Sequence, residues 1–177
     1  IDASARALAL ARDTAILNLA ASVTNTAGTT ATVLDRDAIL DGIFLLDDGN
    51  ALGDRYGVLS AQGALDIRKD LNADAATGFN TLAQRGFENG QYSASDYVGS
   101  FMGIPFFKSS NVYSNGGDDF GMIFTRYAFG IAEGNGGEIM LLEGVNPSTR
   151  ILGQSLTLVY GSGIVSQACA TRLRHAA

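Results

Sequence analysis

The stretch Asp96–Tyr113, D-Y-V-G-S-F-M-G-I-P-F-F-K-S-S-N-V-Y, predicts a β-hairpin. Its apolar side chains occur at the density expected of strands, and Gly99, Gly103 and Pro105 interrupt them. Gly103 can take a positive φ at no steric cost, while Pro105 fixes its own φ and favours an extended conformation at Ile104. We therefore expect the chain to turn at residues 103–105 and run back along itself. The stretch contains no carboxylate pair, histidine or thiol that would indicate a catalytic centre.

The sequence before this hairpin predicts mainly helices. Residues 2–23 are rich in alanine and place apolar side chains at i, i+3 and i+4, as an amphipathic helix does. Residues 35–49 predict a second helix, which begins at an N-cap aspartate and ends at a glycine. A short strand at 55–59 is expected to lead directly into a third helix at 60–71, which begins at an N-cap serine. Residues 75–85 predict one further helix.

The sequence after the hairpin predicts mainly strands. Residues 109–119 are polar and predict a loop, and glycines at 135–137 and 161–163 predict turns. Apolar or alternating patterns predict strands at 121–124, 129–132, 138–143, 156–160 and 164–173, with a corner at 125–127. Because helices dominate the first half and strands the second, the pattern favours an α+β fold over a doubly wound α/β fold.

Length, composition and charge exclude several classes of protein. With 177 residues, 46% of them hydrophobic, the chain fits one globular domain that buries roughly 70% of its unfolded surface. Its formal charge of -6, from 18 acidic and 12 basic residues, argues against a protein that grips nucleic acid through phosphate neutralisation. No apolar run approaches the roughly 20 residues that span a bilayer, and no signal sequence is recognisable.

Two features concern the cellular setting and the extent of the chain. Cys169 is the single cysteine, which excludes an intrachain disulfide framework and favours an ordinary buried thiol in a reducing compartment. The chain does not begin with Met, and Ile1 lies within the first predicted helix. We therefore expect an N-terminal portion of unknown size to precede it.

Candidate acid, base and metal residues are few. Asp118 and Asp119 are adjacent, so their side chains should point apart, and a solvated loop is the favoured interpretation. His175, the single histidine, lies near the C-terminus, where side chains are usually mobile. Together with Arg172 and Arg174 it predicts a small basic tip, which would be solvated or would contact phosphate or a neighbouring subunit's acids. One cysteine and one histidine exclude a zinc site.

The glycine-rich and serine-containing segments also lack catalytic context. Residues 134–137 and 161–163 have neither the strand-to-helix setting nor the following Lys-Ser/Thr or ribose-binding acid that phosphate and dinucleotide loops need. No serine lies in a G-x-S-x-G sequence. A chain with a strong core and no catalytic constellation is expected to bind or build rather than to catalyse.

Three blocks occur in order: A-R-A-L-A-L-A-R-D-T-A-I-L-N-L (Ala5–Leu19), D-R-Y-G-V-L-S-A-Q-G-A-L-D-I (Asp54–Ile67) and V-G-S-F-M-G-I-P-F-F-K-S-S-N-V (Val98–Val112). These blocks resemble three segments of the major capsid proteins of tailed bacteriophages, which have the Hong Kong phage type of shell fold. The first block resembles the spine helix, and the second resembles the strand and helix of the axial domain. The third resembles the family's V-G-x-x-x-G-[I/F]-P-[V/F]-x-x-S-[S/N] segment. Residues 121–132 and 154–173 resemble its later strands.

The resemblance implies an α+β capsid-type fold with three parts. Residues 1–29 would be the spine helix of the peripheral domain, 30–152 the axial domain, and 153–177 the return strands of the peripheral domain. Gly99, Gly103 and Pro105 would be structural turn residues, and no catalytic, cofactor-binding or metal-binding residue is implied.

The resemblance also implies a function in assembly. Many copies would form hexamers and pentamers of an icosahedral head shell around double-stranded DNA, which the acidic wall would contact only weakly. Portal, scaffold and decoration proteins are further candidate partners, and no membrane or cofactor is expected. The implied location is the virion, with assembly in the host cytoplasm.

Three alternatives remain open from the sequence. An encapsulin-like compartment would have the same fold and an enzyme cargo. A small hydrolase or lyase would use Asp118, Asp119 and His175. A β-rich adhesion or tail component is a third alternative, against which the two N-terminal helices argue.

Overall fold

The computed structural model describes residues 2–30, 32–74, 96–134, 140–146, 151–157 and 159–177. Helices and the first two strands come early in the chain: α1 (Asp2–Leu17), a 3-10 turn (Asn18–Ser22), β1 (Thr26–Ala27), α2 (Arg36–Asp48), β2 (Arg55–Leu59) and α3 (Ala61–Asp74). Strands follow: β3 (Tyr97–Phe101), β4 (Ile104–Lys108), β5 (Tyr113–Ser114), β6 (Asp118–Thr125), β7 (Phe129–Glu133), β8 (Met140–Asn146), β9 (Ile151–Thr157), β10 (Tyr160–Ile164) and, after a 3-10 turn at Gln167–Cys169, β11 (Ala170–Ala176). The fold is α+β, as predicted.

A seven-stranded sheet forms the centre of the fold, in the order β1-β11-β6-β2-β4-β3, with β5 also paired to β6. β6 is antiparallel to both β11 and β2, and β2 is parallel to β4. The sheet therefore joins segments from both ends of the chain, because β1 pairs with β11 across most of the sequence.

Each face of this sheet is covered by a different set of helices. α2 and α3 pack on one face, and α2 buries Ala38, Ile39, Ile43 and Leu46 there. On the other face the end of α1 and the following 3-10 turn bury Leu17, Ala20 and Val23 against the sheet residues Phe120 and Met122. Successive side chains of β11 point to opposite faces of the sheet, as in any β-strand.

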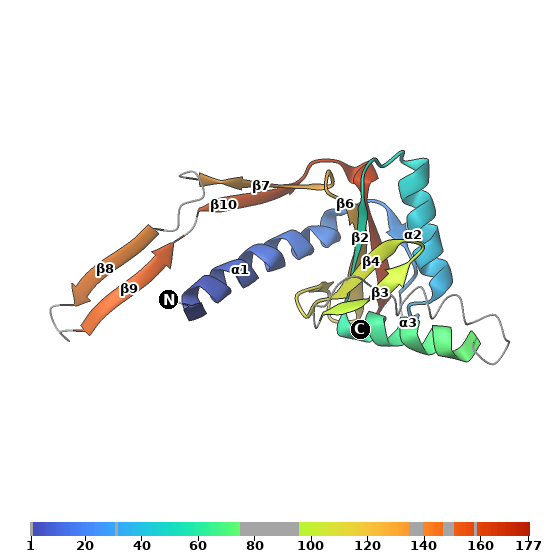
Figure 1. The fold of residues 1–177 in the computed structure, drawn as a ribbon, viewed down its shortest axis with the longest axis horizontal. Helices are drawn as coiled ribbons and strands as arrows, with labels where there is room; N and C mark the ends of the chain where they lie inside the picture. The colour runs from blue at the N-terminus through green and yellow to red at the C-terminus, as the bar shows by residue number, and fades with distance from the viewer. Residues whose placement is uncertain (1, 31, 75–95, 135–139, 147–150, 158) are drawn as a thin grey trace.

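Two β-ribbons extend from the sheet along α1 (Figure 1). β7 pairs with β10, and β8 pairs with β9, both in antiparallel register. The β7–β10 ribbon runs beside α1, where the Arg12 guanidinium lies 2.7 Å from the Glu133 carboxylate. Figure 1 shows β8–β9 at the end of the molecule opposite α2 and α3.

Several of the local predictions are confirmed. The Asp35 carboxylate accepts a hydrogen bond from the Ala38 N–H at 2.8 Å and so caps α2. The Ser60 hydroxyl accepts one from the Gly63 N–H at 3.0 Å and caps α3. β2 has the predicted bounds, and the corner at 125–127 closes with a bond from the Ala128 N–H to the Thr125 carbonyl at 3.0 Å.

Several predictions for the last third are corrected. β6 begins at Asp118, so the predicted loop at 109–119 contains β5 and the start of a strand. Residues 161–163 lie within β10 rather than in a turn, because each pairs with a residue of β7. The predicted long strand at 164–173 is divided by the 3-10 turn before β11. The helix at 75–85 and the turn at 135–137 lie outside the described residues.

The strand β11 belongs to the central sheet, because it pairs along its whole length with β6. The strands β7 and β10, by contrast, form a ribbon beside α1, and β8 and β9 form a second ribbon farther from the sheet (Figure 1).

Candidate functional site

The β3–β4 hairpin turns through two residues. Phe101 pairs with Ile104, and between them Met102 and Gly103 have φ values of 51° and 80°, as in a two-residue turn with both residues left-handed. The turn is therefore one residue earlier than the predicted 103–105. Met102 is 70% exposed at the tip, and a Cβ at Gly103 would meet nothing within 4 Å.

The other two predicted turn residues, Gly99 and Pro105, lie within the strands β3 and β4. Pro105 is buried in β4 opposite Ser100 and precedes the stretch of β4 that pairs with β2. Its missing N–H therefore costs no bond to β2. The register of β3 shifts between Tyr97 and Gly99, which is a β-bulge. Gly99, Gly103 and Pro105 thus shape one hairpin and bring no reactive group to the surface.

The predicted acidic and basic residues near the C-terminus form a structural cluster on one face of the sheet. Asp118 is buried, and one of its carboxylate oxygens accepts bonds from Arg174 Nε at 3.0 Å and Nη2 at 2.7 Å. Arg172 donates to the Thr26 hydroxyl at 2.6 Å and to the Ala21 carbonyl at 3.1 Å. The interpretations of a solvated loop and of a solvated basic tip are therefore wrong, because β11 lies inside the sheet.

His175 lies on the opposite face and is fully buried. Its Nε2 is 3.4 Å from the Ser60 hydroxyl oxygen, and its Nδ1 is 2.9 Å from the Ala176 carbonyl oxygen. The expectation of a mobile tail is wrong for this residue. Asp118 and His175 are therefore separated by the sheet. Asp119 is the cross-strand partner of His175, but the imidazole is fully buried and a substrate could not reach it.

Ser60 and Gly63 contribute to this buried cluster in a way that the sequence analysis missed. Ser60 both caps α3 and faces the imidazole. A Cβ on Gly63 would lie 2.7 Å from His175 Nε2, so only glycine lets the helix approach the ring this closely. A glycine in a segment of good helix formers is a signal of such close packing, although it does not say which residue is approached.

The described residues contain neither a candidate metal site nor a candidate membrane span. No group of three or more histidine, cysteine, aspartate or glutamate side chains is arranged to hold a metal ion there. No helix in the same part of the chain has the length and apolarity to cross a membrane. Cys169 is partly buried and packs against both hydrophobic clusters.

The most distinctive surface is the outer face of α2. Asp37, Asp41, Phe44 and Asp48 follow one another at helical spacing and are all exposed. Phe44 is 66% exposed. We call these four residues the acidic face.

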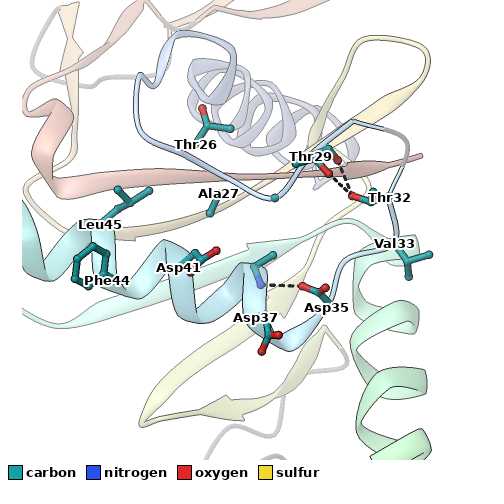
Figure 2. A pocket seen from close by; sticks show the side chains of 12 residues that line it. Thr26, Ala27, Thr29, Thr32, Val33, Asp35, Asp37, Asp41, Phe44 and Leu45 are labelled. Atoms are coloured by element: carbon teal, nitrogen blue, oxygen red, sulfur yellow. Dashed lines mark hydrogen bonds between the residues drawn. The ribbon is translucent and has the colours of Figure 1, made fainter.

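A groove of about 530 Å³ runs beside the acidic face. Its walls are α2 and the segment from β1 to the start of α2, including Thr26, Thr29, Thr32 and Val33. Figure 2 shows Asp41 and Phe44 side by side on α2, opposite the β1 segment, with Asp35 and Asp37 at the beginning of the helix. Val33 is 62% exposed, so the groove combines two open apolar side chains with several carboxylates.

A second groove, of about 410 Å³, lies where α1 meets the sheet. Its lining is mainly apolar, with charged residues at the rim: Ile16, Leu17, Val58, Phe107, Phe124, Ser109, Asp13, Asp96 and Lys108. Both grooves are open and shallow. They can accept a surface of another protein chain more readily than they can enclose a small molecule.

The fold thus combines a central sheet, two helices on one face, a long helix on the other face and ribbons that extend beside that helix (Figure 1). No family model matches the sequence, and no curated protein is similar to it. Solved structures do share the fold.

A protein of Mycobacterium phage Che8 aligns over 97% of this chain and 61% of its own length, with 18% identity and a TM-score of 0.72. The SrpI encapsulin of Synechococcus elongatus aligns over 94% and 60%, with 12% identity and a TM-score of 0.70. The capsid of Helicobacter pylori bacteriophage KHP30 aligns over 99% and 66%, with 12% identity and a TM-score of 0.59. The chain thus has the capsid fold of the Hong Kong phage type, and it spans about three fifths of the first two of these chains.

Proposed function

We propose that the chain is the shell-forming part of a tailed-phage major capsid protein, which assembles from many copies into an icosahedral head around double-stranded DNA. The observation that carries this proposal is the capsid fold, which extends over 97% of the chain in the alignment with the phage Che8 protein. The buried positions of Asp118 and His175 add to it, since they remove the constellation on which a hydrolase would depend. The protein would act without catalysis or a cofactor.

The two halves of the molecule would have different places in the shell. The sheet with α2 and α3 would be the axial part, which faces the local symmetry axis of a hexamer or pentamer. α1 and the two ribbons would be the peripheral part. This division replaces the boundary at residue 153, because β11 pairs with β6 in the sheet.

The negative net charge of the chain is compatible with a shell that encloses DNA without binding it tightly. A formal charge of -6 would let packaged DNA slide along the inner wall, whereas a strongly basic wall would bind its phosphates. We expect the DNA to be held by weak contact only. Portal, scaffold or decoration proteins would complete the particle in the host cytoplasm.

The assembly proposal is tested with the full-length source protein. Sedimentation velocity and negative-stain electron microscopy are expected to find closed shells of uniform diameter, tens of nanometres across. A protein that remains a monomer or small oligomer across the accessible concentrations would contradict the proposal.

A second candidate is an encapsulin-like compartment, which the TM-score of 0.70 to the SrpI encapsulin favours. The contents of shells purified from the source organism separate the two candidates. Nuclease-resistant DNA of uniform length inside the shell supports the phage head. A co-purifying enzyme without DNA supports the compartment.

A further inference from the structure

The acidic face of α2 has a counterpart of opposite charge on α3. The exposed residues of α3 include Leu65, Arg68 and Lys69, which follow at i, i+3 and i+4 and so share one side of the helix. Leu65 is 46% exposed. We call these three residues the basic face. Each face thus combines one exposed apolar side chain with two or more charges of a single sign.

The charges of both faces are largely free of partners within the described part of the chain. Asp47, which lies beside the acidic face, is paired with Arg55, and Asp37 lies 3.8 Å from Arg36. Asp41 and Asp48 form no ion pair there, and neither do Arg68 and Lys69. These four charges can form the polar rim of an interface, and the two exposed apolar side chains can form its centre.

The two faces form no ion pair with each other within the described residues of one copy. α2 stands along one side of the sheet and α3 lies across its base (Figure 1). The helices meet at one corner, where the Arg36 N–H donates to the Asp70 carboxylate at 3.0 Å. From that corner the acidic face follows α2 along the groove, and its exposed side chains are directed away from the core that α2 shares with the sheet.

We propose that the acidic face of one copy docks against the basic face of the next copy. This inference rests on the proposed function, for which it names the contact between neighbours. Acidic face against acidic face would repel, and so would basic against basic, so the charges select a head-to-tail contact. Head-to-tail contacts generate rings when the rotation between copies closes. Phe44 with Val33 on one copy and Leu65 on the other supply the apolar centre.

Charge reversal tests this contact. The acidic-face variant carries Asp41→Lys and Asp48→Lys, and the basic-face variant carries Arg68→Glu and Lys69→Glu, all in the full-length protein. Each variant alone is expected to raise the concentration needed for assembly by about tenfold or more, because every neighbour contact then sets like charges together. Circular dichroism should show unchanged folding, since all four side chains are exposed.

A mixture of the two variants is the experiment that decides whether the two faces contact each other. In a ring that alternates them, lysines on α2 face glutamates on α3, and the remaining contacts pair wild-type faces. An equimolar mixture is therefore expected to recover hexameric rings, whereas every five-membered ring keeps at least one like-charged contact and should stay weak. Matched controls make the same change of net charge outside both faces, with Asp54→Lys, Ala7→Lys and Ala9→Lys, or with Arg6→Glu and Arg126→Glu. These are expected to assemble like the wild type.

The outcomes separate this inference from the proposed function. If the wild type forms shells and both face variants form them equally well, the docking contact is wrong and the assembly function stands. Failure of the mixture to recover hexameric rings would also overturn the head-to-tail contact. If the wild type forms no multimer, the proposed function fails and the docking contact fails with it.

Discussion

The Arg174 guanidinium donates two hydrogen bonds, of 3.0 and 2.7 Å, to a single carboxylate oxygen of Asp118 on the neighbouring strand. The Asp118 side chain is 9% exposed and that of Arg174 is 32% exposed, so the carboxylate is desolvated while the guanidinium keeps contact with water. This pair joins the last strand of the chain to the middle of the sheet. A buried carboxylate of this kind depends on its partner far more than a surface carboxylate does.

Replacement of Arg174 by Met is expected to lower the free energy of unfolding by about 2 kcal/mol, below the roughly 3–5 kcal/mol of a fully buried pair, because Arg174 is partly solvated. The double variant Asp118→Asn with Arg174→Met should lose less, since no buried charge then remains. Urea unfolding of the full chain measures both. As a control, Arg12→Met removes the exposed pair with Glu133 and should cost less than about 1 kcal/mol. Equal losses for Arg12→Met and Arg174→Met would contradict this account.

Replacement of Gly63 by Ala should destabilise the protein, although alanine is favoured over glycine in helices by about 1 kcal/mol. The new Cβ would lie 2.7 Å from His175 Nε2 and 3.3 Å from Leu34 Cδ2. We expect a net loss of roughly 1–3 kcal/mol from overpacking, measured by thermal or urea unfolding. With His175→Ala in the background, the loss caused by Gly63→Ala should shrink. A gain of stability from Gly63→Ala alone would show that the helix can move away.

Substitutions at the tip of the β3–β4 hairpin measure the cost of backbone strain without a change in packing. Because a Cβ at Gly103 meets no atom, Gly103→Ala is expected to cost about 1 kcal/mol, from the left-handed φ alone. Met102→Gly should leave stability unchanged or raise it slightly, since Met102 also has a left-handed φ.

We predict further that substitution of Gly103 or Pro105 impairs assembly more than it unfolds the isolated subunit. Unfolding and sedimentation of the same variants test both statements, and normal assembly would refute the second.

Two buried threonines provide a matched comparison of hydrogen bonding. Thr171 and Thr125 are both fully buried. The Thr171 hydroxyl has no partner within the described residues, whereas that of Thr125 accepts a bond from the Tyr127 N–H at 3.4 Å. Thr171→Val is therefore expected to be neutral or to add about 1 kcal/mol to the free energy of unfolding, and Thr125→Val to remove about 1 kcal/mol. A loss at Thr171 as large as that at Thr125 would indicate a bond that this account lacks.

Features that depend on near neighbours in the chain were predictable from the sequence. The capped starts of α2 and α3, the strand β2 and the β3–β4 hairpin each follow from side chains within a few residues, such as Asp35 and Ser60. Local hydrogen bonds and steric limits act before any tertiary contact forms, so they leave a readable pattern. The order of these elements also carried the resemblance to the capsid fold.

Features that depend on distant segments were not predictable in this way. His175 and Asp118 look like polar residues of a tail and a loop, yet β11 pairs with β6 and buries both. Their burial follows from a strand pairing across about fifty residues, which no local pattern encodes. Because alternation along β11 then places neighbours on opposite faces, Arg174 meets Asp118 while His175 meets Ser60.

The sequence by itself determined the α+β class, the capped helices and the hairpin turn, since glycine, N-cap residues and apolar spacing act within a few residues. Only the tertiary structure decided which groups are buried, which are paired and which faces remain open. Gly57 illustrates the difference: a Cβ there would lie 2.2 Å from the Phe106 ring, which reaches it only because β2 and β4 are neighbours in the sheet. Packing between segments far apart in the chain fixes such contacts, and packing also leaves the charged faces of α2 and α3 exposed.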